Sequence, residues 1–246
     1  MKTVRILHPI MPEYRRAFYS NLVELGKTDG VEYLISAGSA PLDARGRGDE
    51  IAEASFFTFV ESKEYVFGNR SIVRHFLSRD WLKADLIIAE HAIRNWVVLK
   101  WCYFRSPHRL AFWGHGRTYT KVKTGIEESF KMRMLRRADW YFAYTKGGAS
   151  DVTSVGFPPN QVTVVQNSTD TNLLRRLRSE ASPEDVVAVR AQLGLETEKL
   201  AVFVGALDET KRLEFIVEAA TRVALVHSDF KIIFFGAGLQ KEYIQN

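Results

Sequence analysis

Short apolar runs recur along the chain, and segments with a helical spacing of apolar residues separate most of them. The runs before residue 170 are 3–7, 31–36, 55–60, 85–90, 109–113, 139–144 and 161–165. The helical spacing is seen at Tyr14, Phe18, Leu22 and Leu25, at Ile72, Val73, Phe76 and Leu77, and at Ile126, Phe130, Met134 and Ala138. Strands that alternate with amphipathic helices predict an α/β fold, with a parallel sheet covered by helices on both faces.

This rhythm stops near residue 170 and later begins again. Residues 171–198 are polar and contain one clear helix signal, with Ser182 as N-cap, Pro183 at the first position and Gly194 as the stop. Apolar runs return at 200–207 and 231–238. We therefore expect a complete domain over 1–170, a linker with one helix over 171–198, and the start of a second domain over 199–246.

The composition limits the class of protein without selecting a function. The chain has 34 Lys and Arg against 29 Asp and Glu, a net charge of +5, which suits nucleic acid, an anionic membrane surface or polyanionic small molecules. Its single cysteine, Cys102, excludes an internal disulfide framework. No apolar run is long enough to span a membrane, and the short apolar stretch before Pro9 is unlike a signal peptide. The expected location is the cytoplasm.

Polar side chains follow several strands of the first predicted domain, and ligands bind parallel sheets beyond the carboxyl ends of their strands. His115 follows one strand between Gly114 and Gly116, whose backbone freedom would let the imidazole project from the strand end. Glu90 ends the preceding strand, and Arg15 follows the first strand. Each has a structural alternative, a helix cap for Glu90 and a solvated helix face for Arg15.

The second predicted domain carries cations and glycines at corresponding places. Lys211 and Arg212 begin a predicted helix over 211–227, where the positive end of the helix dipole favours a bound anion. Asp208 and Glu209 could equally neutralise these cations on a solvated surface. Gly236 and Gly238 end the next strand, where a ligand or a simple turn before a helix would each explain them. The sequence contains no zinc, serine-hydrolase or Walker A pattern.

Four segments, in this order, resemble the retaining glycosyltransferases of family 4, which have the GT-B fold. Residues 8–22, HPIMPEYRRAFYSNL, resemble the opening strand, loop and helix of that family. Residues 85–99, DLIIAEHAIRNWVVL, followed by FWGHGR at 112–117, resemble one of its subgroups. Residues 138–171 resemble the end of its N-terminal domain, and FVGALDETKRLEFIVEAA at 203–220 resembles its donor-binding motif. Ala206 and Arg212 depart from that motif, which commonly has arginine and glycine at these two positions.

The resemblance implies two Rossmann-like, doubly wound domains and transfer of a sugar from a nucleotide-sugar with retention of configuration, without a metal or other cofactor. The acceptor would be a glycan, a lipid-linked sugar or a cell-envelope precursor, as in polysaccharide biosynthesis. His115 would be catalytic, with Arg15, Glu90 and Arg117 on the acceptor side. The donor side would contain Gly205, Lys211, Arg212, Gly236 and Gly238. Only the first part of the donor domain lies within the chain, which we expect to be inactive by itself.

The sequence also allows two other functions, and it contains a group of basic residues that could form a surface. The chain could be a non-catalytic binding module of the same fold. Nucleic-acid binding is disfavoured, because the sequence has no helix-turn-helix, zinc or RNP-type signature. A group of basic residues predicts peripheral attraction to an anionic membrane, with a solvated basic face as the alternative. These residues are Arg117, Lys121, Lys123, Lys131, Arg133, Arg136 and Arg137.

Overall fold

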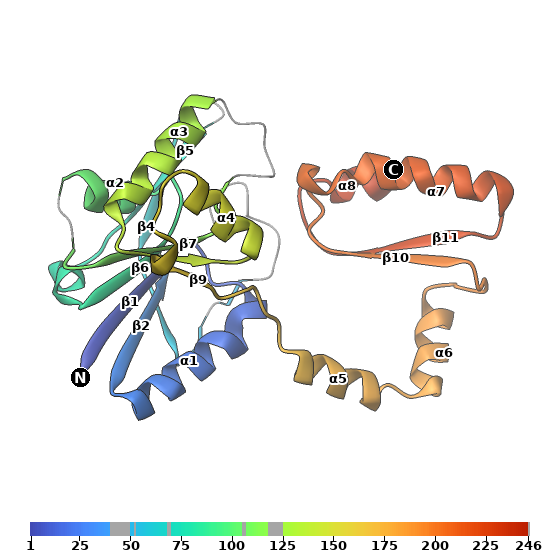
Figure 1. Ribbon diagram of the computed structural model, residues 1–246. Helices are drawn as coiled ribbons and strands as arrows, with labels where there is room; N and C mark the ends of the chain where they lie inside the picture. The colour runs from blue at the N-terminus through green and yellow to red at the C-terminus, as the bar shows by residue number, and fades with distance from the viewer. Residues whose placement is uncertain (40–49, 52, 68–69, 105–106, 118–124, 246) are drawn as a thin grey trace. The chain divides into compact units, whose positions relative to one another are not determined.

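The computed structural model describes residues 1–246 apart from 40–49, 52, 68–69, 105–106, 118–124 and 246 (Figure 1). The described residues form two compact units, one within 1–169 and the other within 170–246. Each unit has its own parallel strands and its own helices. Among the described residues, no helix has both the length and the apolar character that a membrane crossing requires.

The first unit is built on a seven-stranded sheet with the order β3-β2-β1-β6-β7-β8-β9. Every neighbouring pair in it is parallel. Its strands are β1 (Lys2–His8), β2 (Val31–Ala37), β3 (Phe57–Phe59), β6 (Leu86–Glu90), β7 (Leu110–Gly114), β8 (Trp140–Ala143) and β9 (Val162–Val164). The chain leaves β1 toward one edge and returns to build the other, so the sheet is doubly wound and the predicted α/β fold class is confirmed.

Helices cover both faces of this sheet because its strands are apolar on both sides. Ile6 faces a cluster that contains Tyr19, whereas the next residue, Leu7, faces a second cluster that contains Val98 and Val152. Tyr19 belongs to α1 on one face, and Val98 and Val152 belong to α2 and α4 on the other (Figure 1). The helical elements are η1 (Glu13–Arg15), α1 (Arg16–Asp29), η2 (Arg79–Lys83), α2 (Trp96–Tyr103), α3 (Gly125–Met134), η3 (Leu135–Arg137), α4 (Lys146–Ser154) and η4 (Pro159–Gln161).

One predicted helix is wrong. The residues around Ile72 and Val73 form an antiparallel hairpin, in which β4 (Ser62–Phe67) pairs with β5 (Arg70–His75). Val73 and His75 are buried and alternate with exposed Arg74, which is the two-residue period of a strand. β-branched residues favour strands, and a short apolar run does not by itself separate strand from helix.

The second unit contains two parallel strands, β10 (Leu200–Val204) and β11 (Lys231–Phe235). The helix signal at Ser182 is confirmed, because Ser182 and Asp185 form a reciprocal capping box at the start of α6. An additional helix precedes it, and the carboxylate of Asp170 caps this helix by accepting from the Asn172 and Leu173 amides at 3.0 Å. The helical elements are α5 (Thr171–Glu180), α6 (Pro183–Gln192), η5 (Glu209–Lys211), α7 (Leu213–Val226) and α8 (Lys241–Gln245).

Candidate functional site

The strand order of the first unit reverses between β1 and β6, which pair from Val4 and Leu86 to Leu7 and Ala89. The chain passes from β1 to β2 on one side of this point and from β6 to β7 on the other. Doubly wound sheets bind their ligands beyond the carboxyl ends of the strands at such a reversal. The side chains that follow β1, β6, β7 and β8 are therefore the candidates for this site.

Arg15 is placed at this edge by η1, the turn that follows β1, and only 9% of its surface is exposed. Its guanidinium donates hydrogen bonds to the phenol oxygens of Tyr14 at 3.0 Å, Tyr19 at 3.4 Å and Tyr144. Its Cζ also lies 5.8 Å from the centre of the Trp113 ring. Among the described residues no carboxylate forms an ion pair with Arg15. Neutral aromatic groups hold its guanidinium in place, so its positive charge is not neutralised and stays available to an anion.

A hydrogen-bond relay continues from Arg15 to the end of β1. Tyr19 accepts from Arg15 and is hydrogen-bonded to Nε2 of His8. Burial, followed by the charge of Arg15, lowers the pKa of His8 from 6.5 to about 3. His8 is therefore neutral at physiological pH, and its Nε2 accepts a hydrogen bond from the Tyr19 hydroxyl. The hydrogen bonds that connect His8, Tyr19 and Arg15 hold the guanidinium of Arg15 in place.

His115 follows β7 through a turn that depends on glycine. Gly116 has a φ of 78°, and a Cβ placed on it would lie 2.8 Å from the carbonyl oxygen of Gly148 in α4. Its amide donates to the phenol oxygen of Tyr141 at 2.9 Å. This close approach of the turn to α4 leaves the imidazole of His115 exposed at the end of the strand. A glycine was expected to give this turn its backbone freedom, and Gly116 does so through its positive φ.

Tyr144 connects Arg15 with His115. Its hydroxyl accepts from Arg15, and its ring centre lies 4.4 Å from that of His115. Partial burial, followed by the charges of Lys131 and Arg15, lowers the pKa of His115. His115 is thus kept neutral near pH 7, so it can donate or accept a hydrogen bond. Tyr144 was not among the predicted site residues, although the pattern that indicated His115, a polar residue just after a strand, also applies to Tyr144.

Glu90 ends β6 and is half-buried. Burial raises the pKa of the Tyr144 phenol, Arg15 opposes this rise, and the negative charge of Glu90 adds a smaller contribution to it, so Glu90 acts electrostatically on the same cluster. The next residue, His91, has a structural role, because its Nε2 donates to the backbone oxygen of Lys131 at 2.8 Å and its ring stacks on Phe112. The structure therefore brings Arg15, Glu90 and His115 to one edge of the sheet through Tyr144.

Arg117 lies on the outer side of this edge. Its Nε is 3.5 Å from Oδ1 of Asp151 in α4, and about half of its side chain is exposed. Because Arg117 is about half exposed, solvent screens this pair and it contributes little to stability, which leaves the guanidinium able to exchange Asp151 for another anion. Lys131, one of the residues of the predicted basic surface, is buried and therefore does not belong to that surface. Lys121 and Lys123 lie outside the described residues.

The candidate glycines of the second unit lie where the loops after β10 and β11 pack against each other. A Cβ on Gly236 would lie 1.9 Å from the carbonyl oxygen of Gly205, and one on Gly238 would lie 2.3 Å from that of Leu207. The amides of Gly205 and Leu207 donate to Phe235 and Ala237 at 3.0 and 2.9 Å. The close packing of the two loops after β10 and β11 therefore requires glycine at 236 and 238, and the role of these glycines in binding a donor stays a prediction.

Lys211 and Arg212 are exposed at the junction between η5 and α7. Arg212 is in the left-handed conformation, with φ 51° and ψ 53°, and its guanidinium lies over the ring of Phe215 at 5.2 Å. The Asp208 carboxylate caps η5 by accepting from the Thr210 amide at 3.0 Å. The two cations thus stand at the start of α7, as expected, with Arg212 immediately before its first residue.

The described part of the chain holds no group of three or more His, Cys, Asp or Glu side chains arranged to bind a metal ion. The arrangement at the sheet edge instead combines an oriented arginine, a neutral histidine and a carboxylate. These groups can hold a polar ligand by charge and hydrogen bonds and can position a hydroxyl group.

No family model and no curated protein sequence matches the chain. Solved structures do match. S. aureus MnaA in complex with UDP has a TM-score of 0.59 and 16% identity, and the match covers 100% of this chain and 64% of that one. Anabaena HepE in complex with UDP and glucose gives 0.57 and 14%, with the same two coverages. The UDP-GlcNAc 2-epimerase from Neisseria meningitidis bound to UDP-GlcNAc gives 0.54 and 13%, with coverages of 95% and 65%.

The chain therefore spans just under two thirds of the length of these proteins. At this level of identity the likeness concerns the fold. It agrees with the seven-stranded parallel sheet and the separate unit of parallel strands and helices described above. The chain has the α/β architecture of the GT-B type, with a Rossmann-like, doubly wound first unit.

Proposed function

We propose that the chain is part of an enzyme that uses a nucleotide-sugar and transfers its sugar to an acceptor with retention of configuration, without a metal. The observation that carries this proposal is the cluster of Arg15, Tyr144 and His115 at the carboxyl edge of the sheet. An exposed neutral histidine beside an oriented arginine is suited to positioning a sugar hydroxyl. The UDP or UDP-sugar in the solved structures supports a nucleotide-sugar as the donor.

The acceptor side of this proposal is the first unit, with Arg15, Glu90, His115 and Arg117 around a glycan or lipid-linked acceptor. The donor side is the second unit. There, Lys211 and Arg212 supply positive charge at the start of α7 for a diphosphate, which is the leaving group. The glycines at 205, 236 and 238 shape the loops that carry this edge of the second unit.

Donor binding is tested by isothermal titration calorimetry with UDP, UDP-glucose and UDP-N-acetylglucosamine. We expect saturable binding of at least one of them, and a loss of affinity of about tenfold or more in Lys211→Ala, because a charge-assisted contact to phosphate is lost. Lys231→Ala is the matched control, since Lys231 is an exposed lysine of the second unit at the amino end of β11, the opposite end of that strand from Gly236 and Gly238. No saturable binding to any of the three compounds would contradict the proposal.

A second candidate function is epimerisation of a nucleotide-sugar. The specific observation in its favour is the likeness to the UDP-GlcNAc 2-epimerase from Neisseria meningitidis. The two reactions differ in their products. An epimerase converts a UDP-sugar into a second UDP-sugar without an acceptor, whereas a transferase releases UDP and forms a glycoside only when an acceptor is present. Product analysis by NMR with and without acceptor therefore separates them.

A non-catalytic binding module would bind a nucleotide-sugar in the calorimetric experiment and give neither product.

We further propose peripheral association with an anionic membrane through three exposed arginines at the end of α3 and just after it, Arg133, Arg136 and Arg137. Phe130, on the same helix, is 39% exposed and stacks on Tyr103. Basic and aromatic side chains on one surface favour an anionic lipid interface.

A further inference from the structure

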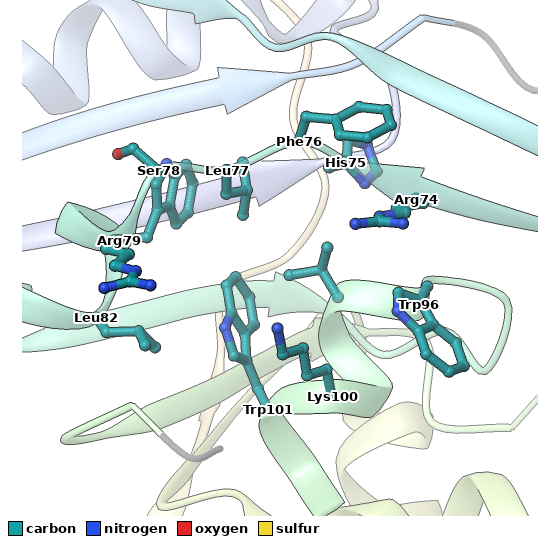
Figure 2. Close-up of a pocket in the computed structure, with 12 residues that line it drawn as sticks. Arg74, His75, Phe76, Leu77, Ser78, Arg79, Leu82, Trp96, Lys100 and Trp101 are labelled. Atoms are coloured by element: carbon teal, nitrogen blue, oxygen red, sulfur yellow. The ribbon is translucent and has the colours of Figure 1, made fainter. Parts of the chain in front are cut away.

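A pocket of about 350 Å³ lies in the first unit between β5, η2 and α2 (Figure 2). Two residues separate η2 from β6, so Trp81 is placed toward the amino end of β6, whereas five residues separate the carboxyl end of β6 from α2, which carries Trp96 and Lys100. A five-residue strand such as β6 spans about 16 Å. The pocket therefore extends from the amino-terminal side of β6 toward its carboxyl-terminal side, and none of its lining residues is Arg15, Glu90, His115 or Tyr144.

The charge of this pocket is entirely positive. Arg74 from β5, Arg79 from η2 and Lys100 from α2 line it, and none of its twelve lining residues is acidic. The part of the chain that the structure describes provides no ion pair for any of these three side chains. Figure 2 shows them on different sides of the pocket. Like charges held around one space repel one another, and an anion placed among them would relieve that repulsion.

Aromatic rings form the rest of the pocket. Trp81 and Trp101 are stacked with their ring centres 6.0 Å apart and are each only 4% exposed, so they make a rigid wall. Trp96 is 45% exposed and Phe76 is 42% exposed, so both present ring surface to solvent beside the cations. Flat indole faces next to positive charges match a ligand with an apolar face and an anionic group.

We propose that this pocket binds an anionic sugar, a pyranose ring that carries a carboxylate or a phosphate. The apolar C–H face of the ring lies against indole, and the anionic group lies among Arg74, Arg79 and Lys100. The volume of about 350 Å³ is at the lower end of the range for small-molecule sites, about 300–1,000 Å³, which suits a single ring with its charged group. The proposal concerns side chains other than those placed at the reaction edge and does not depend on the proposed function.

Intrinsic fluorescence tests this proposal directly, because Trp81, Trp96 and Trp101 line the pocket and the chain has five tryptophans. The probes are glucuronic acid and glucose 6-phosphate at constant ionic strength, with glucose and inorganic phosphate as controls. We expect saturable changes with both anionic sugars, and affinities at least about tenfold higher than for either control, since charge-assisted contacts and ring stacking act together. Equal affinity for glucose or for phosphate would overturn the proposal.

Variants separate the pocket from the rest of the surface. Arg79→Ala combined with Lys100→Ala should weaken glucose 6-phosphate binding at least about tenfold. Lys83→Ala should not, because Lys83 pairs with Asp80 and does not line the pocket. Trp96→Phe should retain more affinity than Trp96→Ala. Circular dichroism verifies that each variant is folded, and an equal loss in Lys83→Ala would contradict the assignment. Calorimetry with UDP should be unchanged in the pocket variants, which distinguishes this site from the proposed donor site.

Discussion

At the scale of single residues, the candidate site depends on aromatic side chains that hold charged and titratable groups in place. Tyr144 contacts both Arg15 and His115, and Tyr19 connects Arg15 with the buried His8. A phenol stays neutral near pH 7, so a guanidinium that donates hydrogen bonds only to phenols has a positive charge that no partner neutralises. The same burial keeps His8 uncharged. The site therefore presents one fixed positive charge and one exposed neutral imidazole.

The role of His115 is tested by substitution in the complete enzyme. We expect His115→Ala to reduce sugar transfer at least about 10²-fold, because positioning and acid–base groups commonly contribute at that level. Affinity for UDP should hardly change, since the proposed diphosphate contacts belong to the second unit. His108→Ala is the control, as His108 is another exposed histidine of the first unit. Near-normal transfer by a folded His115→Ala protein would show that this histidine is structural.

The buried His8 predicts acid sensitivity of the first unit. The unfolded chain binds a proton at this residue below about pH 6.5, whereas the folded chain does so only near pH 3, where its pKa lies. The stability contributed by the neutral form is complete above pH 6.5 and falls by about 1.4 kcal/mol per pH unit below it. Urea unfolding at pH 7.5, 6.5 and 5.5 measures this slope. His8→Gln should reduce it, and an unchanged slope would contradict the assignment.

At the scale of elements, the turns that end the strands decide which side chains reach the site. Gly116 lets the turn after β7 pass close to Gly148, and the exposed position of His115 follows from this contact. In the second unit, the loops after β10 and β11 approach one another through Gly205, Gly236 and Gly238. Both arrangements need the space that a side chain would occupy.

Two glycine variants test this argument. Gly116→Ala should destabilise the first unit by about 1–3 kcal/mol, because its φ is 78° and the new Cβ would lie within 2.9 Å of two atoms of α4. Gly125→Ala is the matched control, since Gly125 begins α3 in open space and its substitution should change stability by at most about 1 kcal/mol. Urea unfolding compares the two. Equal effects would show that the turn tolerates a side chain.

At the scale of the whole molecule, the chain combines a net charge of +5 with an exposed basic and aromatic surface near α3. The net charge attracts anionic partners of every kind, whereas a localised surface orients the protein on one of them. Arg74 and Arg79, which line the pocket between β5, η2 and α2, belong to different elements from the arginines near α3. The two surfaces can therefore be tested independently.

Membrane association is tested by co-sedimentation with vesicles of neutral and of mixed anionic lipid. We expect binding only to anionic vesicles and a decrease with added salt, because the attraction is screened over about 8–10 Å. Arg133→Glu combined with Arg136→Glu should reduce it. Arg175→Glu combined with Arg178→Glu changes the net charge equally on exposed α5 and should have a smaller effect. Equal binding to neutral vesicles would count against the proposal.

The sequence by itself determined the strands and therefore the fold class. Every apolar run that predicted a strand became one, because buried strands of a parallel sheet are continuously apolar over a few residues. The capping box at Ser182 was equally local and was found. The β4–β5 hairpin was missed, since Ile72 and Val73 fit both periods and only pairing with the partner strand decides between them.

The tertiary structure decided which of the candidate residues meet. Arg15 and Tyr144 are 129 positions apart in the sequence, so no local pattern joins them, and the parallel sheet brings both to one edge. The burial of Lys131 and the mutual packing of Gly205 with Gly236 were also outside the reach of spacing. The pocket between β5, η2 and α2 was hidden for the same reason, because the hairpin that forms one of its sides was predicted as a helix. Local sequence specifies which helices and strands form, whereas contacts between distant segments decide which charged side chains lie together and where a pocket forms.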